Sequence, residues 1–126
     1  MPRVHVASAL LICLFWSIPC FSSTRELSIS KYEEMKRRDE FAFYITGVQS
    51  GLAWAATFAA TTGGKPLYCP PDEPLTEDEL FEITDAGVQA MLRNPGYLSA
   101  PLDQRRHFKV SQALMLELIR RYPCND

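Results

Sequence analysis

The stretch FAFYITGVQSGLAWAATFAA, residues 41–60, decides the fold of this chain. Its apolar and small side chains recur at helical spacing along one stripe, and Phe43, Trp54 and Phe58 add apolar surface on other faces. A helix that is apolar on all sides is either a buried central helix or a membrane span. The uncharged run over residues 41–64 is long enough to cross a bilayer, but its many alanines and hydroxyl side chains favour a buried helix.

Glycines shape the middle and the end of this segment. Gly47 and Gly51 stand four residues apart, and in a soluble helix such a pair predicts close approach by a neighbouring backbone. The run Thr61–Pro66 contains two glycines and a proline, which are stop signals for a helix. We therefore expect a proline-rich connection over residues 61–75 to follow the central helix.

Two amphipathic helices are predicted after this connection. Thr76 and Glu79 form a capping box, which begins a helix that stops at the Asn94-Pro95-Gly96 signal. The last helix is expected to start between residues 103 and 108, and Pro123 ends it. Both helices carry an apolar stripe on one face and charged residues on the other.

A short polar helix is predicted before the central one. It covers residues 31–38, with a capping box from Ser30 to Glu33 and three basic residues in its last turn. No alternating strand pattern is present anywhere in the chain. The sequence therefore predicts an all-α fold, a small four-helix domain with a buried central helix.

The N-terminal segment has the pattern of a Sec-type signal peptide. A short basic start precedes the uncharged residues 6–16, Pro19 breaks the run, and small side chains allow cleavage after Ser22. An uncleaved anchor would need a longer apolar stretch. We therefore expect a signal peptide over residues 1–22 and an exported helical domain over residues 23–126.

Removing the signal peptide leaves two cysteines, Cys69 and Cys124. In an oxidising compartment two cysteines and no others indicate one disulfide. The bridge would close a loop of about fifty residues, which corresponds to about 4 kcal/mol of stabilisation from loop-closure entropy.

Composition and charge describe one mildly acidic globular domain. The chain has 126 residues, of which 47% are hydrophobic, and 13 Lys and Arg against 15 Asp and Glu give a net charge of −2. Such a chain has no general attraction for phosphate backbones, so we expect no nucleic-acid partner.

Catalytic and metal-binding patterns are scarce. The exported domain contains one histidine, His107, and no nucleophile motif accompanies it. The acidic run from Asp72 to Glu82 lacks the ligand order of an EF-hand, and no cysteine or histidine spacing fits zinc. We therefore expect no catalytic residues, no cofactor and no metal site.

Two segments are candidates for binding another protein. The acidic region over residues 72–85 could meet a basic surface, and the loop Thr61–Tyr68 could project a contact. The alternatives are an ordinary solvated helix face and a plain connection. The candidate partner contacts are Lys65, Tyr68, Asp72, Glu73, Glu77 and Asp78.

Four short motifs, read in order, resemble those of one family. They are Tyr44-Ile45-x-Gly47-Val48, Cys69-Pro70, Asn94-Pro95 and Tyr122-Pro123-Cys124. In these motifs the chain resembles the Rap/Tai-type immunity proteins of type VI secretion systems. The likeness covers about Tyr44 to Cys124, although the chain lacks a further cysteine pair that family members often carry near the first helices.

The resemblance implies a small helical periplasmic protein with a Cys69–Cys124 bridge. Proteins of this family are often dimeric, so a homodimer is possible, and they bind and block cell-wall amidase toxins delivered by neighbouring cells. The implied partner is therefore a cognate secreted cell-wall hydrolase, with no membrane span after signal cleavage.

Two other functions remain open at this point. A small helical periplasmic chaperone of the acid-stress type would share the size, the helices and the single disulfide. A small inner-membrane protein would use Phe41–Gly64 as its span.

Overall fold

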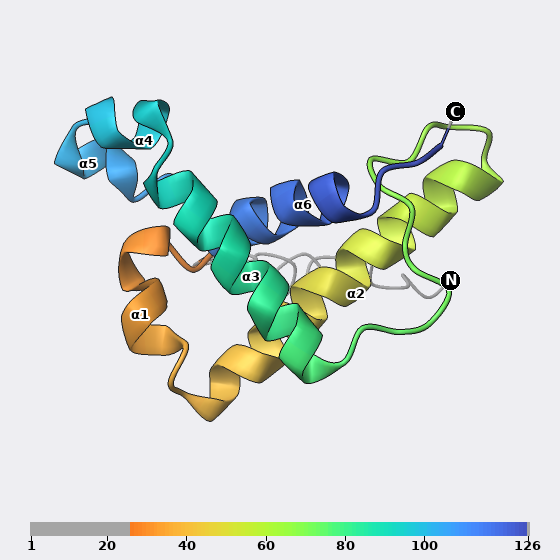
Figure 1. Ribbon diagram of the computed structural model, residues 1–126, viewed down its shortest axis with the longest axis horizontal. Coiled ribbons are helices and arrows are strands. Elements are labelled where there is room, and N and C mark those ends of the chain that lie inside the picture. The colour runs from red at the N-terminus through yellow and green to blue at the C-terminus, as the bar shows by residue number, and fades with distance from the viewer. Residues whose placement is uncertain (1–25, 126) are drawn as a thin grey trace, which may run out of the picture.

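The computed structural model describes residues 26–125, and within this range the protein is helical, with no strand. The predicted signal peptide over residues 1–22 lies outside the described residues. The elements in chain order are the 3-10 turn η1 (Ile29–Lys31) and the helices α1 (Tyr32–Met35), α2 (Asp39–Thr61), α3 (Glu77–Leu92), α4 (Pro95–Ser99), α5 (Leu102–Arg105) and α6 (Val110–Arg121) (Figure 1). The all-α class is confirmed.

The predicted count of four helices is too low, because the segment between α3 and α6 folds into α4 and α5. The Asn94 side chain caps α4 by accepting a hydrogen bond from the Gly96 N–H at 2.8 Å, and Pro95 occupies the first helical position. Proline is favoured there because its missing N–H would have no partner inside the helix.

The first helix is also shorter than predicted. The predicted capping box of Ser30 and Glu33 does not form, because Ser30 lies in η1 and α1 covers only Tyr32–Met35. The backbone N–H of Ile29 donates to the Phe108 carbonyl at 3.0 Å, so this part of the chain is held by the segment that precedes α6. This tertiary contact outweighs the local capping signal.

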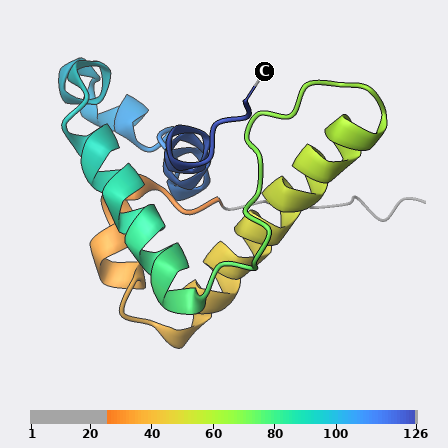
Figure 2. The ribbon, with the colours of Figure 1, turned by 45° about the vertical axis from the view of Figure 1, so that its right-hand side comes forward.

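The core lies where α3 crosses α6 and both contact one face of α2 (Figures 1 and 2). Phe41 and Ile45 contribute from α2, and Ile83, Leu114 and other fully buried side chains contribute from α3 and α6. Phe41 also packs edge-on against the buried Tyr32 ring, with ring centroids 5.5 Å apart, which ties α1 to the core.

Close backbone approach occurs at Gly87, not at the predicted glycine pair. A Cβ on Gly87 would collide with the Ala113 carbonyl oxygen of α6 and would lie 2.9 Å from the Ala113 carbonyl carbon. A Cβ on Gly47 or Gly51 would have no described atom within 4 Å. The glycine in α3 is therefore the one that brings two helices together.

The buried central helix is not confirmed, because α2 is covered on one face only. Phe43, Trp54 and Phe58 are 80%, 72% and 55% exposed. With 23 residues, α2 is longer than α3 or α6, and its C-terminal part extends beyond both (Figures 1 and 2). Among the helices described between residues 26 and 125, none has the length and apolar character to cross a membrane.

Candidate binding surface

The α2–α3 connection (residues 62–76) begins with a sharp reversal at the end of α2. Gly63 has a φ of 78°, a left-handed conformation that suits glycine because it has no Cβ. The Gly64 N–H donates to the Ala59 carbonyl at 2.8 Å and so satisfies an acceptor at the helix end. The chain then runs back toward the start of α3 (Figure 2).

The predicted disulfide between Cys69 and Cys124 is present and holds the connection near its middle. The two Cα atoms are 5.0 Å apart, and the Cys69 N–H donates to the Tyr122 carbonyl at 2.9 Å. One covalent bond and one backbone hydrogen bond therefore attach the connection to the end of α6.

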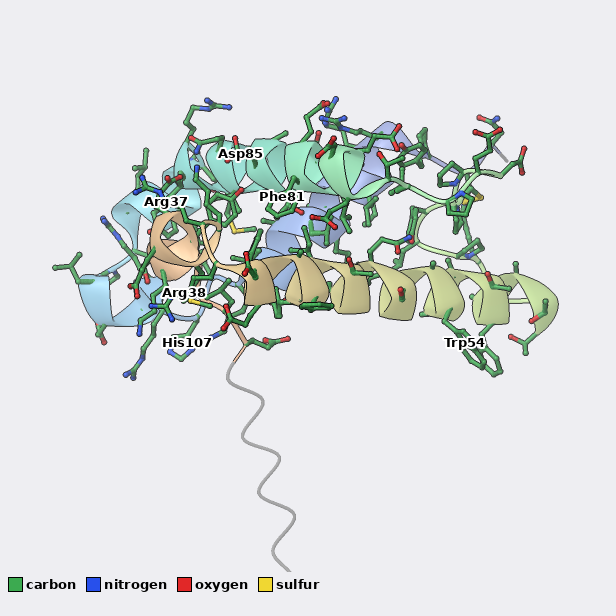
Figure 3. The ribbon with its side chains drawn as sticks, turned by 90° about the horizontal axis from the view of Figure 1, so that it is seen from below. Arg37, Arg38, Trp54, Phe81, Asp85 and His107 are labelled. Carbon is green, nitrogen blue, oxygen red and sulfur yellow. A yellow bond between two sulfur atoms is a disulfide. The ribbon has the colours of Figure 1, made fainter. Side chains whose placement is uncertain are left out.

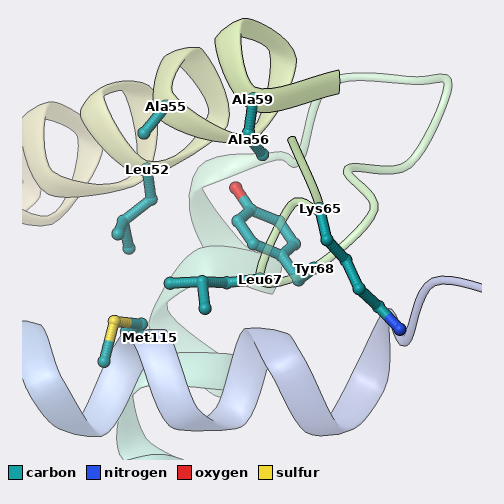
Figure 4. Close-up of a pocket in the computed structure, with 8 residues that line it drawn as sticks. All are labelled: Leu52, Ala55, Ala56, Ala59, Lys65, Leu67, Tyr68 and Met115. Carbon is teal, nitrogen blue, oxygen red and sulfur yellow. The ribbon is translucent and has the colours of Figure 1, made fainter. Parts of the chain in front are cut away.

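A second attachment lies one residue earlier, at Tyr68. This side chain is 2% exposed and lines an apolar pocket of about 120 Å³. The pocket lies between α2, the connection and α6 (Figure 4), and its lining residues are Leu52, Ala55, Ala56, Ala59, Lys65, Leu67, Tyr68 and Met115. Burial raises the pKa of the Tyr68 hydroxyl above its ordinary value. Tyr68 is therefore a core residue that anchors the connection, and it is not available as a surface contact.

The neighbouring Leu67 lines the same pocket (Figure 4) but is 67% exposed. The sequence analysis missed it, because a single leucine in an irregular segment carries no periodic signal that distinguishes an outward from an inward side chain. Both side chains extend toward the space between α2 and α6, but the Tyr68 ring is covered and Leu67 is not (Figure 4).

Five of the six predicted contact residues do lie on the surface. Lys65 is exposed beside the pocket, and Asp72, Glu73, Glu77 and Asp78 are exposed along the second half of the connection and the first turn of α3. These four carboxylates follow Leu67 along the chain, and all four are exposed.

At the start of α3, one carboxylate forms part of the helix cap and two others do not. The Thr76 hydroxyl accepts a hydrogen bond from the Glu79 N–H at 3.3 Å, and the Glu79 carboxylate accepts from the Thr76 N–H at 2.8 Å. These bonds confirm the predicted capping box. The bonds that the Glu79 carboxylate accepts from the Thr76 N–H and then from its hydroxyl lower the pKa of Glu79. Glu77 and Asp78 make no contribution to the cap, so they point outward from a fixed helix start.

The other end of the acidic region is occupied by an ion-pair network. The buried Glu117 carboxylate accepts hydrogen bonds from Arg120 and Arg121, and Arg121 also pairs with Glu82 of α3 at 3.0 Å. The hydrogen bonds from Arg120 and then Arg121 outweigh burial and lower the pKa of Glu117 to about 2. Glu82 therefore belongs to the α3–α6 contact and not to the candidate binding surface.

His107 lies on the surface in the turn between α5 and α6. Within residues 26–125 no group of three or more His, Cys, Asp or Glu side chains is arranged to hold a metal ion. Of the features described so far, the one suited to binding another molecule is the α2–α3 connection with its exposed leucine and carboxylates.

Comparison of the chain with protein-family models, with curated proteins and with solved structures gives no significant match.

Proposed function

We propose that the protein is a periplasmic immunity protein that binds and blocks a cognate peptidoglycan amidase delivered by a type VI secretion system. The observation that carries the proposal is the α2–α3 connection, which is fixed by the Cys69–Cys124 bond and by buried Tyr68 while it exposes Leu67. The motif resemblance supplies the class of partner.

A fixed connection suits an inhibitor because binding costs less entropy when the contact segment is already ordered. An exposed leucine on a fixed segment offers apolar surface that a partner can remove from water. Blocking then requires only that the connection cover the entrance of the partner's active site, without chemistry in this chain.

The four exposed carboxylates give the proposed contact surface a negative charge. Asp72, Glu73, Glu77 and Asp78 make this part of the surface negative. Charges at the rim of an interface speed association and make it sensitive to salt. We therefore expect the partner to present basic groups around its active-site cleft.

The test is affinity capture from secreted and periplasmic extracts with the oxidised domain, residues 23–126, as bait. The bait is compared with an Asp72→Lys/Glu73→Lys variant and with a Glu33→Lys/Glu34→Lys control that changes the same charge on α1. We expect the wild type and the control to capture one peptidoglycan hydrolase and the first variant to lose most of it.

Two results would contradict the proposal. The first is a captured set without any peptidoglycan-cleaving enzyme. The second is a broad mixture of proteins that binds only after acidification, which is the behaviour of the chaperone alternative.

A further inference from the structure

A groove of about 340 Å³ lies between α3 and α6. Its apolar lining consists of Gly87, Ala90, Met91, Phe108, Ala113 and Leu116. Sites for small molecules have volumes of this order and are mostly apolar, with a few polar groups that fix the ligand. Every lining residue lies between positions 87 and 120, so the groove is separate from the α2–α3 connection and from the contact proposed for a hydrolase.

Three polar side chains, Asn94, Glu117 and Arg120, complete the lining. The Asn94 Oδ1 is occupied by the α4 cap. The Glu117 carboxylate is occupied as well, because it accepts hydrogen bonds from Nε and Nη2 of Arg120 and from Nε of Arg121. In the described part of the chain, Nη1 of Arg120 has no partner.

The buried Glu117 carboxylate fixes the Arg120 guanidinium at the edge of the groove. A guanidinium has five N–H donors in one plane, and the two that bond to Glu117 leave three for another acceptor. The Arg120 side chain is 68% exposed, so these donors can be reached from solvent. A carboxylate matches them best, because a guanidinium can bind its two oxygens with parallel hydrogen bonds.

We propose that this groove binds a small amphiphile with one carboxylate, in the class of medium-chain fatty acids. The aliphatic chain lies against Met91 and Leu116, and the carboxylate accepts hydrogen bonds from the outward donors of Arg120. Leu116 is 53% exposed, so a bound chain would remove apolar surface from water.

The volume of the groove sets the size of the ligand. A cavity of about 150 Å³ takes up benzene, so the groove has room for roughly twice as many heavy atoms, about ten to twelve. This corresponds to an acid of eight to ten carbon atoms.

The paired state of Arg120 favours an anionic head group over the alternatives. A cationic head group would have to displace Arg120 from Glu117, whereas a carboxylate adds a partner to Arg120 without breaking that pair. An uncharged head group gains less, because a hydrogen bond between ionised groups is roughly twice as strong as one between neutral groups.

The test is NMR of the oxidised domain, residues 23–126, with ¹³C-labelled methionine methyl groups. Met91 lines the groove, whereas Met115 lines the separate pocket beside the α2–α3 connection. We expect sodium octanoate to shift the Met91 methyl resonance with a Kd below about 1 mM, and to leave the Met115 resonance in place. The uncharged 1-octanol should shift the same resonance but bind roughly tenfold more weakly.

Arg120→Gln tests the head-group contact. It should lower the affinity for octanoate to that for 1-octanol and leave the affinity for 1-octanol unchanged. Arg37→Gln is the matched control, because it removes the same charge from an exposed position beside α1 (Figure 3). This control should keep the roughly tenfold preference for octanoate.

Ala90→Trp tests the apolar part of the groove. Its ring occupies the space of the aliphatic chain, so both probes should bind at least about tenfold more weakly. Ala60→Trp makes the same change at an exposed position of α2 outside the groove and should bind like the wild type. Thermal melting shows that each variant is folded.

Four results would overturn the proposal. They are a Met91 resonance that octanoate does not move, equal affinities of the wild type for octanoate and 1-octanol, full octanoate binding by Arg120→Gln, and full binding of both probes by Ala90→Trp.

Discussion

Among substitutions on α3 that add or remove one methyl group, Gly87→Ala should destabilise the fold most. The added Cβ would collide with the Ala113 carbonyl oxygen of α6 and would lie 3.1 Å from the Glu117 Cβ. Because the first of these is a backbone atom, a rotamer change cannot relieve the clash, and α3 must move away from α6.

The magnitude follows from two opposing effects. Overpacking of a closely packed contact costs about 1–3 kcal/mol. Alanine has a higher helix propensity than glycine, which returns about 1 kcal/mol in a helix interior. Because the clashing atom belongs to the backbone, we expect an overpacking cost at the upper end of about 1–3 kcal/mol. The net loss of unfolding free energy is then about 2 kcal/mol. In a domain of this size that loss lowers the melting temperature by about 10 °C.

The matched control is Gly47→Ala, in the exposed middle of α2, where a Cβ has no described atom within 4 Å. It should stabilise the fold by about 0.5–1 kcal/mol through helix propensity alone. Both variants are compared with the wild type by urea unfolding at low and high protein concentration, because association would stabilise the folded chain by mass action. Equal or greater stability of Gly87→Ala than of the wild type would refute the close α3–α6 contact.

Three further substitutions test other parts of the structure. Replacing Cys69 or Cys124 by serine should cost about 2–5 kcal/mol, and an unchanged melting temperature after reduction would show that the bridge adds no stability. The Glu117 carboxyl has a folded pKa of about 2, below its ordinary value of 4.5, so its contribution is full above about pH 4.5 and is lost as the pH falls toward 2. Glu117→Gln should therefore cost about 2 kcal/mol of unfolding free energy at neutral pH, a figure reduced for the solvent exposure of Arg120. The variant should also lose less stability than the wild type between pH 4.5 and 2. An unchanged pH profile would contradict this role. Thr76→Ala removes the α3 cap and should cost about 1 kcal/mol in urea unfolding, and no change would mean that the capping box does not hold the helix start.

Local signals in the sequence predict both ends of α3, whereas α6 begins at Val110, after the predicted start between residues 103 and 108. The capping box of Thr76 and Glu79 sets the start of α3, and Asn94 with Pro95 marks its end, because each signal acts through hydrogen bonds to nearby backbone. The same kind of signal failed at Ser30, where hydrogen bonds to the segment before α6 hold the chain in another conformation.

Burial was harder to predict than helix formation. An apolar sequence predicts that α2 is a helix, but how much of it is covered depends on the lengths and positions of α3 and α6. The role of Gly87 depends in the same way on where α6 crosses α3, and spacing along one helix does not contain that information.

The sequence predicts where the candidate binding surface lies along the chain, but it predicts only some of the residues that form it. The connection, its disulfide and its exposed carboxylates follow from breaker residues, cysteine number and charge. The difference in exposure between Leu67 and Tyr68 depends on one backbone path in an irregular segment, for which the sequence has no periodic pattern.

The most direct test of the proposed function is titration of the captured peptidoglycan hydrolase with the purified domain, residues 23–126. Cleavage of purified cell wall is followed while wild-type or Asp72→Lys/Glu73→Lys protein is added. The account predicts that the wild type abolishes cleavage at an equal molar ratio and that the variant needs a large excess, most clearly at low salt. Full cleavage in the presence of excess wild-type protein would contradict it.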